Sequence, residues 1–431
     1  MSKEENRKNF SKYVSQNILG MIGFSCYVLA DSYFISIAKG ADGLTALNLV
    51  MPLYSIIFSI GEMIGVGSAI RYAISKIKKD ADADDYFWNA LIWCILSSML
   101  FVFAGIFFSA DIMRVLGADE HIVAVGNNYT KIFMCFAPMF MCNYVTNAFV
   151  RNDGAPGIAM SATLFSSLFN IVFDYILMFP MNLGMEGAAL ATALSPIIGM
   201  GICSIHFFSK KSSVRLVVCK PSVRKLVAGC QLGVSAFVGE MSSAVITLAF
   251  NFVILKLAGH VGVAAYGVVA NIAIVTTAVF NGVAQGSQPL ISSCFGRGDK
   301  DGCTQLKRMG YTTAFVLAAV MYSILFIFAG QFVAVFNSEG SEMLRLYATE
   351  GVKLYFIGIF FAGINIVGGG AFSATEDAFK AAVVSVARGF VLILGAVFVM
   401  SALFGMTGVW LAYAVAEGIT TFIMLVMAMR V

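Results

Sequence analysis

The chain has 431 residues, of which 59% are hydrophobic and only 12% are charged, and its mean hydropathy is +0.86. Soluble domains carry about 25% charged residues, so this composition excludes a soluble globular protein and indicates an integral membrane protein. The formal net charge of +4 is small and does not by itself identify a partner.

Apolar segments recur along the whole chain, and a transmembrane helix needs about 20 apolar residues. We therefore predict an all-α polytopic membrane fold with twelve transmembrane helices. Their approximate ranges are 13–38, 44–72, 86–109, 124–150, 158–180, 185–208, 227–256, 262–294, 309–335, 347–374, 379–403 and 406–429. The polar stretch 209–226 is the longest connection and falls near the middle of the chain.

Lysine and arginine gather in alternate connections, starting with the N-terminus and including Lys12, Lys76 and Arg151. The other connections hold Lys39, Arg114, Lys131, Lys256, Arg345 and Lys353. Because basic loops stay on the cytoplasmic side, we predict a multi-pass protein of the cell (inner) membrane with both termini cytoplasmic. Arg388 falls inside a predicted span, and its charged head is expected near the cytoplasmic interface. Topology accounts for the basic loops, so no nucleic-acid partner is predicted.

The second half of the chain partly repeats the first at a shift of about 220 residues. Gly43 corresponds to Gly262, and the motif GMEGAALATA at 184–193 corresponds to GMTGVWLAYA at 405–414. Six spans per repeat give both halves the same orientation. We predict an N-terminal six-helix lobe (1–208), a cytoplasmic linker (209–226) and a C-terminal six-helix lobe (227–431). Two such repeats are typical of secondary transporters that alternate access between the two sides of a membrane.

Acidic residues inside the predicted spans point to function, because a charge in hydrocarbon costs about 2.5–3.5 kcal/mol on insertion scales. Asp31 and Asp174 fall in the outer halves of their spans, and Asn170 lies one helical turn from Asp174 on the same face. Oxygen ligands of this kind can hold a proton or a hard cation such as Na⁺. The other acids within spans are Glu62, Glu240 and Glu417. Each acid could instead hydrogen-bond a neighbouring helix.

Four stretches carry a resemblance to a known family. They are ADSYFISIAKG (30–40), RNDGAPGIAM (151–160), FNIVFDYILMFPMNLGMEGAALATALS (169–195) and GVAQGSQPLISSCFGRGD (282–299). With these the chain resembles the multidrug and toxic compound extrusion (MATE) family over essentially its whole length. The resemblance implies twelve helices in two lobes and export driven by an ion gradient.

The resemblance also implies roles for individual residues. Asp31, Asn170, Asp174 and Thr192 match a cation site of the N-terminal lobe, and Tyr129 matches a tyrosine of the same cavity. Glu240 and Asp377 match acids that other relatives use in the second lobe, although Asp377 beside Glu376 could simply belong to a cytoplasmic loop. The coupling ion is left open between H⁺ and Na⁺, and Na⁺ is possible at Asp31, Asn170 and Asp174.

These features together predict a secondary active multidrug efflux transporter that exports lipophilic organic cations in exchange for H⁺ or Na⁺. Glu240 and the rings of Tyr33, Tyr129 and Tyr144 are expected to attract and stack on the cation. No cofactor is predicted, and a monomer suffices because one chain holds both lobes. The alternative is an exporter of lipid-linked sugars or other amphiphiles, which the mostly acidic membrane charges disfavour. An enzyme or a channel is less consistent with three histidines, no HExxH motif and a two-lobe repeat.

Overall fold

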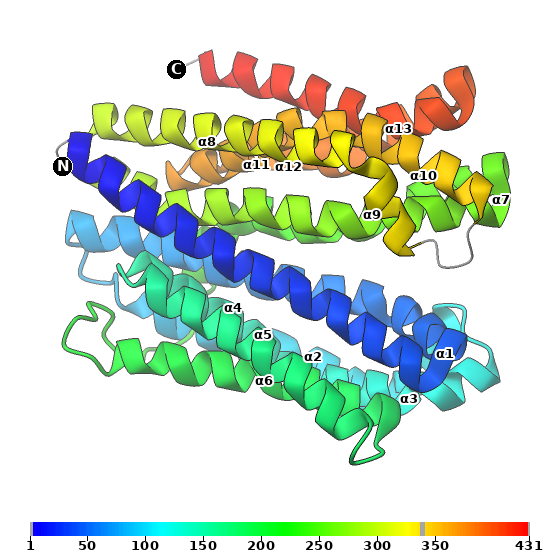
Figure 1. The fold of residues 1–431 in the computed structure, drawn as a ribbon. Coiled ribbons are helices and arrows are strands. Elements are labelled where there is room, and N and C mark those ends of the chain that lie inside the picture. Colours follow the sequence, from blue (N-terminus) through cyan, green and yellow to red (C-terminus); the bar gives the residue numbers. More distant parts are fainter. Residues whose placement is uncertain (1–2, 337–340, 430–431) are drawn as a thin grey trace.

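The computed structural model describes residues 3–336 and 341–429, and it contains helices but no β-strand within these ranges (Figure 1). The main helices are α1 (Lys3–Lys78), α2 (Asp85–Val115), α3 (Glu120–Cys135), α4 (Ala137–Asn152), α5 (Pro156–Met178), α6 (Gly184–Phe207), α7 (Val223–Gly296), α8 (Lys300–Ile327), α9 (Ala329–Phe336), α10 (Glu342–Tyr355), α11 (Ile359–Ala374), α12 (Ala378–Val386) and α13 (Leu392–Met429). Two short elements complete them, the 3₁₀ turn η1 (Phe356–Gly358) and the π turn η2 (Ala387–Val391).

Glycines divide the longest helical elements. α1 has 76 residues, and a straight helix of that length would measure about 114 Å, far more than the hydrocarbon core of about 30 Å. Gly40 in α1, Gly259 in α7 and Gly405 in α13 have φ values of 59°, 62° and 59°. Glycine adopts this left-handed conformation without steric cost. Each of these elements is therefore two spans joined by a sharp break.

Counting at these breaks gives the number of membrane crossings. Within the described residues, nine helices are long and apolar enough to cross a membrane, and α3 with α4 forms a tenth span bent by 46°. Two of the nine, 223–296 and 378–428, contain the breaks at Gly259 and Gly405. Dividing them there gives twelve crossings, the predicted number. The expectation of an all-α polytopic membrane protein is confirmed.

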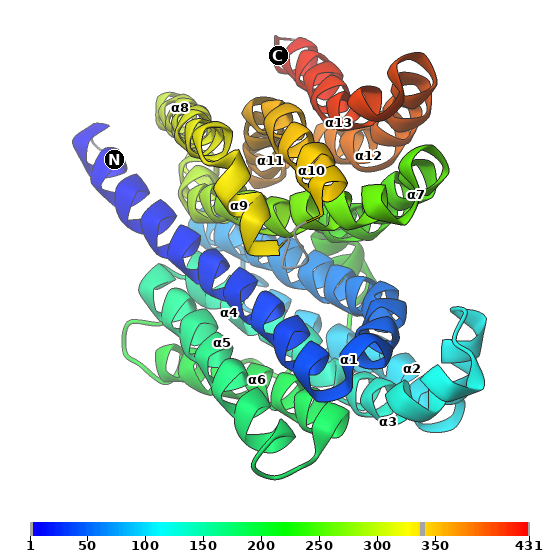
Figure 2. The same cartoon turned by 45° about the vertical axis from the view of Figure 1, so that its right-hand side comes forward.

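The helices form two groups, α1–α6 and α7–α13, that lie against each other (Figure 2). Each group has an apolar core of its own, one built around Phe133 and Phe149 and the other around Phe280 and Trp410. The first part of α1 runs along the boundary, and its N-terminal end lies beside α8 (Figures 1 and 2). The non-helical stretch that joins the groups ends where α7 begins, at Val223.

The two groups meet tightly near the end of the molecule that carries both termini. A Cβ added at Gly67 of α1 would collide with the backbone of Gly229 in α7, and one added at Gly233 would collide with the backbone of Met63. Arg71, one turn beyond Gly67, forms an ion pair with Glu376 of the second group. Small residues and an ion pair thus close the halves together at this end.

Candidate functional site

The N-terminal group holds a cluster of buried polar side chains from three helices. Asp31 comes from α1, Asn170 and Asp174 from α5, and Thr192 from α6. Asp31 is 6% exposed, and the other three are fully or almost fully buried. With its amide oriented to satisfy both neighbours, Asn170 donates to Asp174 Oδ2 at 3.1 Å and accepts from Thr192 Oγ1 at 3.2 Å. The structure therefore brings together the four residues that the sequence predicted as a cation-coupling site.

The two carboxylates of this cluster lack a compensating positive charge. One oxygen of Asp31 and one of Asp174 are buried without any hydrogen-bond partner. The charge of Asp31 acts directly on Asp174. In the part of the chain that the structure describes, neither carboxylate pairs with a Lys, Arg or His. Buried carboxylates are stable only when paired, protonated or bound to a cation, so this cluster is chemically suited to take up H⁺ or a hard cation.

A pair of tyrosines lies next to the carboxylates. The hydroxyls of Tyr54 and Tyr129 are hydrogen-bonded to each other. Both tyrosines lie within electrostatic range of Asp31 and Asp174. The ring of Tyr54 stacks on Phe133 with centroids 3.6 Å apart. Tyr129 is only 1% exposed, and it does not line the two cavities, of about 110 Å³ and 100 Å³, that lie between the halves. It belongs to the acid cluster rather than to an open substrate surface.

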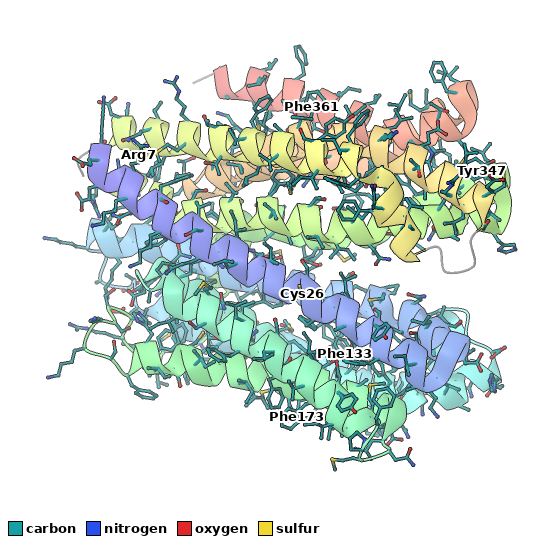
Figure 3. All side chains as sticks on the ribbon, in the orientation of Figure 1. Arg7, Cys26, Phe133, Phe173, Tyr347 and Phe361 are labelled. Carbon is teal, nitrogen blue, oxygen red and sulfur yellow. The ribbon has the colours of Figure 1, made fainter. Side chains whose placement is uncertain are left out.

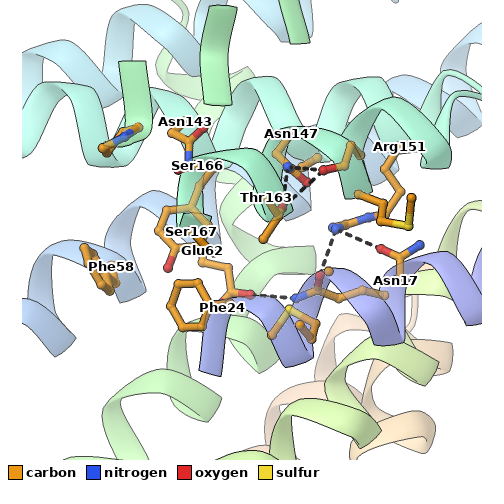
Figure 4. Close-up of a pocket in the computed structure, with 18 of the residues that line it drawn as sticks. Asn17, Phe24, Phe58, Glu62, Asn143, Asn147, Arg151, Thr163, Ser166 and Ser167 are labelled. Atoms are coloured by element: carbon orange, nitrogen blue, oxygen red, sulfur yellow. Dashed lines mark hydrogen bonds between the residues drawn. The ribbon is translucent and has the colours of Figure 1, made fainter. Parts of the chain in front are cut away.

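A cavity of about 110 Å³ lies between the two halves, next to this cluster. A chain of hydrogen bonds runs along it from Glu62 to Arg151 and Asn17 (Figure 4). Gln285 of α7 donates to Glu62 at 3.1 Å and accepts from Arg151 at 2.8 Å. Arg151 also donates to Asn17 at 3.5 Å. Phe24, Tyr27, Phe58, Phe140 and Tyr144 line the same space, so the cavity combines aromatic walls with a carboxylate.

A second cavity of about 100 Å³ extends from the first into the other half. Glu62 of α1 and Glu240 of α7 line both cavities, and the charge of Glu240 acts on Glu62 across the boundary. Glu240 has no ion-pair partner among the described residues. The two glutamates place negative charge at the junction of the halves, where a cationic ligand could contact both.

Glu417 is also buried, but its charge is compensated. Arg388 donates to Glu417 Oε1 from Nη2 at 2.7 Å and from Nε at 3.0 Å, and Asn365 donates to Oε2 at 2.7 Å. Arg388 lies in the π turn η2 and lines the second cavity. The expectation that its head reaches the cytoplasmic interface is wrong, because the guanidinium group is held inside the helix bundle by Glu417. This pair makes Glu417 a structural acid.

Two predicted residues lie away from these cavities. Asp377 follows α11 in the short connection to α12 and pairs with Lys380 at 2.9 Å. It therefore belongs to a loop, beside Glu376 that joins the halves. Tyr33 is 62% exposed and packs on Phe34 with ring centroids 5.8 Å apart. It lines neither cavity, because its side of α1 is opposite the buried face that carries Asp31.

The structure adds residues that sequence reasoning did not place in the site, namely Tyr27, Tyr54, Arg151 and Gln285. Arg151 was counted with the basic loops, yet it lies in the last turn of α4 and is 5% exposed. Arg151 begins the stretch RNDGAPGIAM, and Gln285 lies in the stretch GVAQGSQPL. Both stretches carry the family resemblance, so both residues could have been considered as candidates. Tyr27 and Tyr54 had no comparable signal, since aromatic residues are common in every span.

Comparisons with known proteins agree with this geometry. The MatE family model matches residues 17–176 and 236–399. The multidrug export protein MepA of Staphylococcus aureus (strain MRSA252) is 27% identical over 414 residues, which cover 93% of this chain and 89% of the relative. MepA of Staphylococcus saprophyticus is 26% identical over 409 residues, with the same coverage.

Solved structures share the fold. An outward-facing multidrug resistance MATE family transporter of the MOP superfamily superposes with a TM-score of 0.92 at 20% identity, over 99% of this chain and 96% of the other. A MOP superfamily transporter from Pyrococcus furiosus, described as having a binding pocket of reverse polarity, gives a TM-score of 0.91 at 20% identity and the same coverage.

Proposed function

The chain belongs to the MatE (multidrug and toxic compound extrusion) family, and on this premise we propose that it is a multidrug efflux transporter. It exports lipophilic organic cations across the cell membrane in exchange for H⁺ or Na⁺. One observation carries the proposal above all others: Asp31 and Asp174 are buried side by side, and each has an oxygen without a hydrogen-bond partner. Such a pair needs a mobile positive charge, which a coupling ion supplies.

The substrate side of the proposal rests on the cavities between the halves. Glu62 and Glu240 supply negative charge, while Phe24, Phe58 and Tyr144 supply aromatic faces for a cation. A cation over an aromatic ring gains about 0.5–2 kcal/mol. Of the arginines at the cavities, Arg388 is ion-paired with Glu417, which leaves Arg151 against the two glutamates that line the cavities. This disfavours the alternative of a lipid-linked sugar exporter.

Exchange follows from the separation of the two acidic sites. When H⁺ or Na⁺ occupies Asp31, Asn170 and Asp174, the carboxylates no longer attract the organic cation, and the substrate is released outside. The ion leaves on the cytoplasmic side after the halves rock, and the freed carboxylates then favour a new substrate. Both termini are cytoplasmic in this scheme, a monomer is sufficient, and no cofactor takes part.

The experiment is uptake of ethidium into everted membrane vesicles, driven by an imposed pH gradient or Na⁺ gradient. Wild type is compared with Asp31→Asn and Asp174→Asn, and Asp111→Asn, which replaces an exposed acid of α2, is the matched control. We expect one of the two gradients to drive ethidium uptake in wild type and in the control. Each site variant should lose about 90% of this uptake or more, because it removes a membrane-embedded acid. Uptake without any gradient requirement would contradict ion exchange. Uptake that survives both site variants would move the coupling site to Glu240.

A further inference from the structure

A groove of about 870 Å³ lies between the N-terminal part of α1 and α8, away from the cavities that hold the acidic sites. Its walls come from both halves of the molecule. Hydrogen bonds join α1 and α8 at the end of the groove nearest the N-terminus. There Asn6 donates to Gln305 at 3.2 Å, and Gln305 donates to the carbonyl of Lys3 at 2.9 Å. Figure 3 shows Arg7 at this end, where α1 passes α8.

The basic residues of the lining lie at the same end of the groove on both helices. On α1 the lining passes from Lys3 and Arg7 through Ser11 and Ser15 to Ile18, and on α8 from Arg308 and Met309 through Thr312 and Thr313 to Leu317. At 1.5 Å per residue, Arg7 to Ile18 spans about 16 Å and Arg308 to Leu317 about 14 Å. Half of the hydrocarbon core measures about 15 Å. The groove is thus about as long as one leaflet of the hydrocarbon core is thick, with its cations at one end.

The basic residues lie at the level of lipid headgroups. The first large apolar side chains that α1 and α8 expose are Leu19 and Phe315, so Arg7 and Arg308 lie on the aqueous side of the hydrocarbon boundary. Lys3, Arg7 and Arg308 are exposed, and none has an ion-pair partner within the described ranges. The one acid of the lining is Asp301. Three free cations against one carboxylate leave a net positive charge at the headgroup level.

We propose that this groove binds an anionic glycerophospholipid from the leaflet on the side of both termini. Its phosphate lies between Arg7 and Arg308, and one acyl chain reaches Ile18, Met309 and Leu317. Arginine suits this role because its planar guanidinium group binds phosphate oxygens in pairs. The inference requires that the protein spans a membrane, and it is independent of the exported substrate and of the coupling ion.

The position of the groove gives the lipid a conformational effect. The N-terminal part of α1 packs on the second half through Phe10 and Val14, so a lipid between α1 and α8 contacts both halves. A ligand that binds one conformation better shifts the population toward it. Bound lipid is expected to stabilise the arrangement in which α1 lies beside α8.

The test measures the melting temperature of the purified full chain in detergent, titrated with dioleoylphosphatidylglycerol or with dioleoylphosphatidylcholine. The double variant Arg7→Gln/Arg308→Gln removes the two arginines of the groove. Lys8→Gln/Lys12→Gln removes two exposed charges from the same helix that do not line the groove and serves as the matched control. Arg7→Lys/Arg308→Lys retains the charge and shows whether loss of the side-chain shape alone matters.

We expect phosphatidylglycerol to raise the melting temperature of wild type and of the control Lys8→Gln/Lys12→Gln more than phosphatidylcholine does. Roughly tenfold more phosphatidylglycerol should be needed for the same rise in Arg7→Gln/Arg308→Gln, and Arg7→Lys/Arg308→Lys should recover part of the response. If Arg7→Gln/Arg308→Gln and Lys8→Gln/Lys12→Gln weaken the response to phosphatidylglycerol equally, the attraction is diffuse and the proposed site is wrong. Equal stabilisation by glycerol phosphate would assign a free-anion site instead. If the double variant does not fold, the same titration on Arg308→Gln alone decides.

Discussion

At the scale of single residues, the buried acids differ in what balances their charge. Glu417 is held by Arg388 and Asn365. Asp174 accepts a hydrogen bond from Asn170, and Asp31 and Asp174 each leave an oxygen without a partner. Acids with a fixed partner stabilise one structure, whereas acids without one can exchange a proton or cation. This difference predicts opposite effects of neutralising them.

Glu417→Gln should destabilise the protein, because it leaves the guanidinium group of Arg388 buried without its counter-charge. Removing one partner of a buried ion pair costs about 3–5 kcal/mol. Thermal unfolding in detergent measures the change, with Arg388→Met/Glu417→Met as the control that removes both charges. The double variant should be clearly more stable than Glu417→Gln. A single variant as stable as wild type would show that the pair does not hold the second half together.

Asp174→Asn should keep or raise the melting temperature while it abolishes ion-driven transport. The amide keeps the shape and the contact with Asn170 but removes a charge that has no fixed partner. The same unfolding measurement gives the result, and Asp111→Asn reports the effect of an exposed acid. Destabilisation as large as that of Glu417→Gln would mean that Asp174 has a structural counter-charge.

Asp31, Asn170 and Asp174 could be predicted from the sequence because each is a polar residue in an apolar segment, whereas Thr192 and Tyr129 followed only from the family resemblance. Asn170 and Asp174 share a face by their spacing alone, and Asp31 stands out by its charge. The orientation of Tyr33 and the burial of Arg151 could not be predicted in this way. Both depend on how one helix is rotated against its neighbours, which is set by tertiary packing.

At the scale of the elements, hydropathy located every span, but several helices extend beyond the apolar segments. α1 begins at Lys3 rather than near residue 13, because Phe10 and Val14 pack into the core of the second half and make a polar segment helical. The fourth span is bent between α3 and α4, where Pro138 follows the break at Phe136. A proline cannot continue the hydrogen bonds of the preceding turn, and hydropathy averages do not detect such a break.

Gly67→Val should prevent α1 and α7 from closing near the termini, because the added side chain would overlap the backbone of Gly229. Overpacking of this kind costs about 1–3 kcal/mol. The readout is maleimide labelling of Cys230 in a chain whose other cysteines are serine, where opening should raise the labelling rate. Gly201→Val is the matched control, because nothing lies within 4 Å of a Cβ at that position. Unchanged labelling in Gly67→Val would show that this contact does not close the halves.

At the scale of the whole molecule, the internal repeat predicted two groups of helices, and the breaks at Gly40 and Gly259 fall at corresponding places in them. The repeat extends to part of the contact between the groups, because Gly67 corresponds to Gly286, where an added Cβ would collide with the backbone of Val14. It does not predict the ion pair, because the residue that corresponds to Arg71 is Leu290. Gly229 and Glu376 on one side meet Gly67 and Arg71 on the other. The proposed rocking of the halves predicts that Arg71 and Glu376, which are paired at this end, separate once in each cycle.

The central claim is that Asp31 and Asp174 carry the ion that is exchanged for substrate. The direct measurement is ion movement driven by a substrate gradient in proteoliposomes, with ethidium loaded on one side and no ion gradient imposed. H⁺ is followed by a pH-sensitive dye and Na⁺ by flame photometry. We expect ethidium-driven flux of one of these ions in wild type and in Asp111→Asn, and none in Asp31→Asn/Asp174→Asn. Ion flux of wild-type size in that double variant would contradict the claim.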